Sequence, residues 1–230
     1  MKKIFIATLI LIANINQAQN WEWVKLIQPT DNNSYMEAKV GADGKVYAAG
    51  NFSTTINFGN SQSLSGNGDG FAAQFDTAGL CQWAQHIYVT TQGCGCNVQG
   101  NHSYAQTAGT DSEGNAIVYG AFCGCGATFG SGITSSNSGY NLFIAKYNSS
   151  GVCQWVQTKP GSFNPSTGQT YDAMYTVTID ASDNIYVSMF NYATSTTFCG
   201  LTFATGGDYL FKINSSGVGV WVKQIVARVG

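Results

Sequence analysis

Two closely spaced cysteine pairs are the residues best suited to chemistry in this chain. Cys94 and Cys96 precede the first strand of a predicted repeat, and Cys123 and Cys125 follow its second strand. In an antiparallel meander both connections emerge at the same end, so the pairs can meet. The open alternatives are two disulfides, free thiols, or a four-thiolate zinc site, whose ligands are usually two to four residues apart. In an exported protein, disulfides here would contribute about 2–4 kcal/mol each.

Cys81 and Cys153 are predicted to be structural. Each stands two residues before a tryptophan, and Gly219 takes the matching position in the third repeat. A buried small apolar role fits such a replaceable thiol. Matched positions in successive repeats are also poorly placed for the Cα separation of about 4.4–6.8 Å that a disulfide needs. The total of seven cysteines, including Cys199, leaves at least one unpaired in a monomer.

Catalytic residues are not indicated. His86 and His102 have no recognisable nucleophile and orienting carboxylate, so we expect hydrogen-bonded or solvent-facing histidines. Glycoside chemistry needs two carboxyl groups about 5–9.5 Å apart. Most of the 12 acidic residues fall in predicted turns, which leaves Asp172 and Glu37 as weak candidates. We therefore assign no catalytic residue, cofactor or metal ligand.

An internal repeat determines how these residues must be positioned. The stretch from Gly139 to Trp155 recurs at 68–83 and at 206–221, each time as a strand, a tight turn and a strand that reaches a tryptophan. The short segment Trp21–Lys25 resembles a lone copy of the last strand. Marker tryptophans stand at intervals of 60, 72 and 66 residues, and repeats are expected at about 34–86, 103–158 and 173–225. The markers are Trp23, Trp83, Trp155 and Trp221.

Period-two alternation and turn-forming Asp, Asn and Gly predict four antiparallel strands in each repeat. Helical periodicity never persists beyond a turn or two. The expected fold is all-β: a β-propeller-like array of about three four-stranded blades plus one N-terminal strand, an incomplete propeller. A small residue is expected to precede a core phenylalanine by two positions in each repeat. The matched pairs are Gly50 with Phe52, Gly120 with Phe122, and Ser188 with Phe190.

These motifs resemble the bacterial SBBP-type β-propeller repeat. The shared features are a Gly-Asn-like turn before the second strand, Phe58-Gly59, the Asp-Gly-Phe at 69–71, and Gly79 before Trp83. The second repeat keeps most of them, whereas the third has Asp183 in place of the turn glycine. The resemblance covers most of the mature chain. It implies a secreted or surface protein with no common catalytic residues.

The N-terminus predicts export. Lys2 and Lys3 precede an apolar run at 4–13, which is typical of a cleavable signal peptide over residues 1–18 and too short to span a membrane. The repeat domain would then occupy 19–230. Charged residues make up 10 % of the chain, against about 25 % in typical domains, and the net charge is −2. These values argue against nucleic acid as a partner.

The expected function is a non-catalytic binding, adhesion or scaffold module at the cell surface or outside it. Its partner would be an extracellular glycan or a surface protein, and further blades from a longer parent chain would complete the ring. Neutral loops rich in Asn, Ser, Thr, Gly and Tyr suit sugar contacts. The alternative is an extracellular polysaccharide hydrolase or lyase that uses the propeller loop face.

Overall fold

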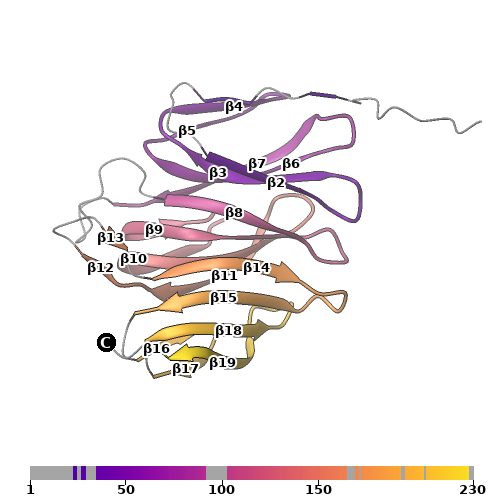
Figure 1. Cartoon of the computed structure of the whole chain (residues 1–230). Coiled ribbons are helices and arrows are strands. Elements are labelled where there is room, and N and C mark those ends of the chain that lie inside the picture. Colours follow the sequence, from indigo (N-terminus) through magenta and orange to yellow (C-terminus); the bar gives the residue numbers. More distant parts are fainter. Residues whose placement is uncertain are drawn as a thin grey trace, which may run out of the picture.

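The computed structural model describes residues 23–24, 27–29, 35–91, 103–164, 169–170, 172–192, 195–204 and 206–227. Regular structure in these ranges consists of β-strands, and the paired strands are antiparallel (Figure 1). The predicted all-β class is confirmed. Within the same ranges no helix is long and apolar enough to cross a membrane.

Three four-stranded meanders follow one another along the chain. The first is formed by β2 (Tyr35–Val40), β3 (Val46–Phe52), β6 (Asp69–Phe75) and β7 (Cys81–Val89). A hairpin is inserted between its second and third strands. We call such an insertion the arm hairpin, and in the first meander it consists of β4 (Thr55–Gly59) and β5 (Gln62–Ser65).

The other two meanders repeat this order. The second consists of β8 (Ser103–Thr110), β9 (Ala116–Thr128), β10 (Thr134–Tyr147) and β11 (Cys153–Pro160), and the far ends of β9 and β10 form its arm hairpin. The third consists of β14 (Ala173–Ile179), β15 (Ile185–Asn191), β18 (Gly207–Ile213) and β19 (Gly219–Ala227). Its arm hairpin is β16 (Thr196–Phe198) with β17 (Leu201–Phe203). A separate two-stranded ladder, β12 (Phe163–Asn164) with β13 (Gln169–Thr170), lies in the connection between them.

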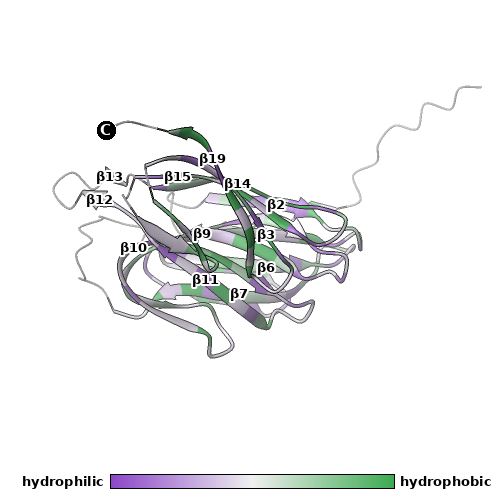
Figure 2. Cartoon of the chain, turned by 90° about the horizontal axis from the view of Figure 1, so that it is seen from below, coloured by the Kyte–Doolittle hydropathy of each residue, from purple (hydrophilic) through white to green (hydrophobic). Residues whose placement is uncertain are grey.

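The first two meanders are not separate sheets. At the end of β7, Tyr88 and Val89 pair with Thr128 and Ala127 in the arm hairpin of the second meander. Hydrogen bonding therefore runs through seven strands, in the order β11-β10-β9-β7-β6-β3-β2, and this sheet curls (Figure 2). The predicted strand order within each repeat is present, but the first two repeats share one sheet, and the third is a separate four-stranded sheet.

The N-terminal segment contacts the first meander in the way that the fourth strand of a preceding meander would. Strand β1 (Gln28–Pro29) pairs with β4 of the first arm hairpin, with Gln28 opposite Asn57. Gln28 stands five residues after Trp23, and Tyr88 stands five residues after Trp83. Each pairs with the residue that precedes a phenylalanine of an arm hairpin: Gln28 with Asn57, and Tyr88 with Thr128. The segment thus contacts the first meander as β7 contacts the second.

The apolar core consists of three layers. One layer fills the space between the first arm hairpin and its own sheet, a second lies between the first and second meanders, and a third between the second and third. Strands β3 and β6 are buried on both faces because layers lie on either side, whereas β15 and β18 alternate between buried and half-buried residues. The third meander is therefore covered on one face only.

A tryptophan crosses each junction and donates its indole N–H to the next meander's last turn. Trp83 Nε1 lies 3.2 Å from Ser149 O, and Trp155 Nε1 lies 3.2 Å from Ser215 O. Trp23 makes the same bond to Thr77 O at 2.9 Å. The acceptor is the second residue of matching turns in all three cases. We call this contact the tryptophan latch.

The turn that receives the latch requires glycine. Gly79, Gly151 and Gly217 end the three turns with φ of +76°, +78° and +80°. A Cβ built on Gly151 would lie 2.7 Å from the Trp83 ring, and the other two would lie 2.8–3.0 Å from Trp23 and Trp155. Left-handed backbone and ring contact therefore both select a residue without a side chain.

In the third repeat, one predicted equivalence between residues is wrong. Met189 pairs with Tyr209 as Gly50 pairs with Phe71, so Asn191, and not Phe190, stands where Phe52 stands in the first repeat. The predicted equivalences of Ser188 and Phe190 are one residue out, because the turn at Asp183 sets the register. Phe190 is half-buried on the opposite face, whereas Phe52 and Phe122 are buried.

The missing thiol at Gly219 also has a packing reason. In the third repeat the arm hairpin carries Cys199 at its tip and Leu201 behind it, and a Cβ on Gly219 would lie 2.5 Å from the Leu201 side chain. Gly219 N instead donates a hydrogen bond to Cys199 O at 2.7 Å. The space that Cys81 and Cys153 fill in the first two repeats is thus occupied here from the hairpin.

The latch predicts unequal costs for two glycine substitutions. Gly151→Ala should lower the free energy of unfolding by about 3 kcal/mol, because it adds left-handed strain and a collision with Trp83. Gly132→Ala is the matched control: its φ is +77° and nothing lies within 4 Å of its Cβ position, so only about 1 kcal/mol of strain is expected. Urea denaturation measures both, and equal costs would contradict the latch.

Candidate interaction surface

The first strands of the three meanders form the surface best suited to binding. Strands β2, β8 and β14 contact one another in succession (Figure 1). Each presents one large exposed tyrosine: Tyr35 is 49 % exposed, Tyr104 37 % and Tyr175 54 %. These strands pair on one edge only within their meanders, so part of each remains accessible. We call this set the tyrosine row.

Polar groups lie between the rings. Gln106 Nε2 is 3.5 Å from the Tyr35 hydroxyl, and Lys39 Nζ is 3.7 Å from a carboxylate oxygen of Glu37. The other Glu37 oxygen, Oε2, is buried and has no hydrogen-bond partner among the described residues. Behind the row, burial and then the Glu37 carboxylate raise the pKa of Tyr119 to about 12. The surface thus combines aromatic faces, an amide and the ion pair of Glu37 with Lys39.

Asp172, one of the two weak acid candidates, is fully buried in an ion pair. Its Oδ1 lies 3.2 Å from Lys159 Nζ, and both side chains are 0 % exposed. The carboxylate also accepts the backbone N–H groups of Ser162 and Tyr192, and Lys159 donates to Pro160 O. Desolvation lowers the pKa of Lys159, and Asp172 opposes that shift. No substrate can reach this carboxylate, and nothing in the sequence singled out Lys159 as its partner.

His86 also has a structural setting. Its Nε2 lies 2.9 Å from Asp69 Oδ2, and its ring packs against Phe52 and Tyr88. Asp69 additionally accepts the backbone N–H of Asn67. The prediction of a hydrogen-bonded histidine is confirmed for His86. His102 lies outside the described residues.

The turn carboxylates hold turns together. Asp111 accepts hydrogen bonds from Asn115 and lies 2.7 Å from Lys146. Burial acts to raise its pKa, but Lys146 and Asn115 outweigh burial and lower it. Asp183 accepts both the backbone N–H and the hydroxyl of Ser112, which links the turns of neighbouring meanders. Within the described ranges, no group of three or more His, Cys, Asp or Glu side chains is arranged to hold a metal.

The cysteines fall into two groups. Cys81, Cys153 and Cys199 are buried and form no disulfide, in agreement with the structural role predicted for the first two. Cys123 and Cys125 do not belong to this group. Cys94 and Cys96 lie outside the described residues, so the cross-link between the two pairs stays a prediction. The signal peptide at 1–18 also lies outside them.

Comparison with known proteins adds no family. No protein-family model matches the chain, and no curated protein matches it. The resemblance to SBBP-type repeats therefore has no family support from these comparisons.

The buried ion pair predicts a strong contrast between the two acid candidates. Asp172→Asn should lower the free energy of unfolding by about 3–5 kcal/mol, because the buried Lys159 ammonium loses its counter-ion. Glu37→Gln, which breaks a partly exposed pair, should cost less than about 1 kcal/mol. Urea denaturation at pH 7 separates the two. A cost for Asp172→Asn no larger than that for Glu37→Gln would contradict the proposed role of burial.

The buried thiols predict alkaline destabilisation. Burial raises the pKa of Cys153 and of Cys199 to about 12, from an ordinary value of 9.0. Between pH 9 and 12 the unfolded chain loses these protons while the folded chain keeps them, so stability falls as pH rises, by up to about 1.4 kcal/mol per pH unit for each thiol.

The comparison of wild type with Cys153→Ala isolates one thiol. Lys159, whose pKa is lowered, acts in the opposite direction below its ordinary value of 10.5, but it is present in both proteins. Denaturation between pH 8.5 and 10.5 should show a shallower loss for the variant. Parallel curves would contradict the assignment.

Proposed function

We propose that the three meanders are blades of an incomplete β-propeller of SBBP-like repeats, in an exported or cell-surface protein. Two observations support the propeller. Each repeat has the strand order of a blade, and the tryptophan latch joins each unit to the next in one direction. The sequence of the N-terminus supports export.

The protein acts in this proposal as a non-catalytic binding module for an extracellular glycan. The observation that carries it is the tyrosine row, because three exposed rings on adjacent strands offer repeated stacking faces for sugar rings. Gln106 and the pair of Glu37 with Lys39 supply hydrogen-bonding groups beside these rings. The mixed charges of Glu37 and Lys39 cancel locally, which favours a neutral polysaccharide over a strongly charged one.

The polysaccharide-cleaving alternative is less well supported by the described carboxylates. Asp172 is buried with Lys159, and Asp111 and Asp183 are engaged in turns. Glu37 is the remaining carboxylate at the tyrosine row, and its charged neighbour there is Lys39, not a second acid. Turnover of a bound polysaccharide in the binding assay would decide for this alternative.

A glycan array probed with the purified secreted chain identifies the ligand class, and titration against the best polysaccharide tests the row. Tyr35→Ala, Tyr104→Ala and Tyr175→Ala should each weaken binding about two- to tenfold, because a stacked ring contributes about 0.5–1.5 kcal/mol. Tyr192→Ala is the control, since Tyr192 is equally exposed but follows β15. Binding unaffected by all three row variants, or weakened as much by the control, would contradict the proposal.

A further inference from the structure

In the third meander, the donors that match those of the earlier junctions reach no neighbouring meander among the described residues. At the second junction, Ser215 O accepts hydrogen bonds from both Trp155 Nε1 and Lys146 Nζ. The matching residues of the third meander are Trp221 and Lys212, because both tryptophans pair with these lysines in the same register. Among the described residues, no group accepts a hydrogen bond from the Trp221 indole. Its ring contacts Tyr186 and Lys223.

Tyr186 of the third meander is a third such donor, and it matches Tyr47 of the first meander. The Tyr47 hydroxyl lies 3.0 Å from Gly114 O across the first junction and 3.1 Å from Asp43 of its own meander. The register places Tyr186 at the position of Tyr47, and its hydroxyl donates to Asp180 of its own meander. Along β19 the third meander also exposes the apolar side chains of Ile225 and Val226.

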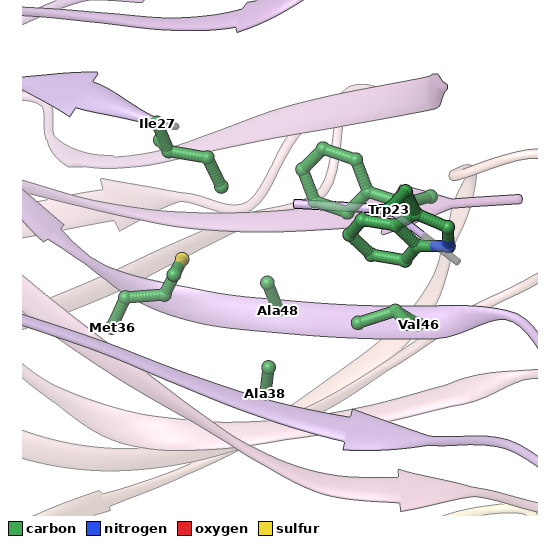
Figure 3. A pocket seen from close by; sticks show the side chains of 7 residues that line it. Trp23, Ile27, Met36, Ala38, Val46 and Ala48 are labelled. Atoms are coloured by element: carbon green, nitrogen blue, oxygen red, sulfur yellow. The ribbon is translucent and has the colours of Figure 1, made fainter. Parts of the chain in front are cut away.

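At the opposite end of the molecule, the matching turn carbonyl of the first meander is covered by the N-terminal segment. Thr77 O is the matching turn carbonyl of the first meander, and Trp23 occupies it. Between this N-terminal segment and the sheet lies an apolar cavity of about 120 Å³ (Figure 3). It is lined by Trp23, Ile27, Met36, Ala38, Val46, Ala48 and Phe75. At the other junctions a complete meander packs on this face, so the segment covers it less fully.

We propose that the outer face of the third meander docks onto the first meander of a second copy of this chain. Trp221 then donates to Thr77 O of that copy, where it replaces Trp23, and Lys212 and Tyr186 reach the same two turns. The contact is head-to-tail and continues the geometry of the two junctions within the chain. Two copies would bring six meanders into succession, within the range of about four to eight for a closed propeller.

The chain's own Trp23 competes with this contact. Because Trp23 is tethered to the site, it acts at a high effective concentration, and association between copies must displace it. Its removal should therefore strengthen association, whereas removal of Trp221 should weaken it. A purely hydrophobic aggregation of the exposed apolar side chains would not respond to the two tryptophans in opposite directions.

The test is analytical ultracentrifugation of the purified full-length secreted chain and two variants over about 1–200 µM. We expect reversible association of the wild type. Trp221→Ala should raise the dissociation constant at least tenfold, the loss expected for one indole contact of about 1.4 kcal/mol or more. Trp23→Ala should lower it at least tenfold. Val220→Ser is the control in the same strand, at a position whose matches Gln82 and Gln154 stay exposed in the first two meanders, and it should change the dissociation constant less than Trp221→Ala does.

Several outcomes would overturn the proposal. These are a wild type that is monomeric throughout, equal association of wild type and Trp221→Ala, or a dimer that disappears on reduction because it is a disulfide. Thermal unfolding of each variant accompanies the measurement. If Trp23→Ala is unfolded, the comparison of wild type with Trp221→Ala decides alone, since the described contacts of Trp221 are confined to its own meander. Glycan binding is measured separately, so its failure leaves this test unaffected.

Discussion

The hydrogen bond from each tryptophan indole to the next meander's turn is the interaction on which this architecture depends. Apolar burial between sheets is not directional, so it permits many sliding positions. The latch adds a polar contact with a defined acceptor at one edge of every junction. The glycine behind the acceptor lets the indole lie against the turn backbone, so that ring burial and hydrogen bond are satisfied together. The two junctions and the contact of the N-terminal segment use the same pair of contacts, and the sheets therefore stack in one register.

The number of sheet faces covered by a neighbouring layer changes along the stack, and the burial of the side chains changes with it. Central strands such as β3, β6 and β9 have layers on both faces and contain few exposed side chains, whereas β15 and β18 alternate. Some polar groups trapped between layers have partners: Tyr47 with Gln74 and Gly114, and Lys159 with Asp172. An unpaired charge at Lys159 would destabilise the connection between the second and third meanders. The hydroxyl of the buried Tyr147, in contrast, has no hydrogen-bond partner among the described residues.

The position of a strand in its meander decides whether its polar and aromatic side chains are buried or accessible. Carboxylates and histidine that could suggest catalysis lie in turns or layers, where backbone and side-chain partners hold them. The first strands, with one free edge, keep three tyrosines and Glu37 near solvent. Sequence reasoning anticipated tyrosine-rich neutral surfaces, but it placed them in loops. It had no means to align Tyr35, Tyr104 and Tyr175 on neighbouring strands, because the bulges in β8 and β14 shift their register.

The sequence by itself determined the strand content, the four-strand repeat and the spacing of the marker tryptophans. Alternating side chains, turn-forming Asp, Asn and Gly, and the spaced tryptophans are local signals, and local backbone preference suffices to interpret them. Tertiary structure alone decided which turn carbonyl each indole meets, that β7 pairs onward with β9, that Phe190 lies one residue from its predicted match, and that Lys159 neutralises Asp172. These are contacts between residues distant in sequence, and they depend on how closely two sheets approach. That separation is set by side-chain volumes on both facing surfaces together, which no single stretch of the chain contains.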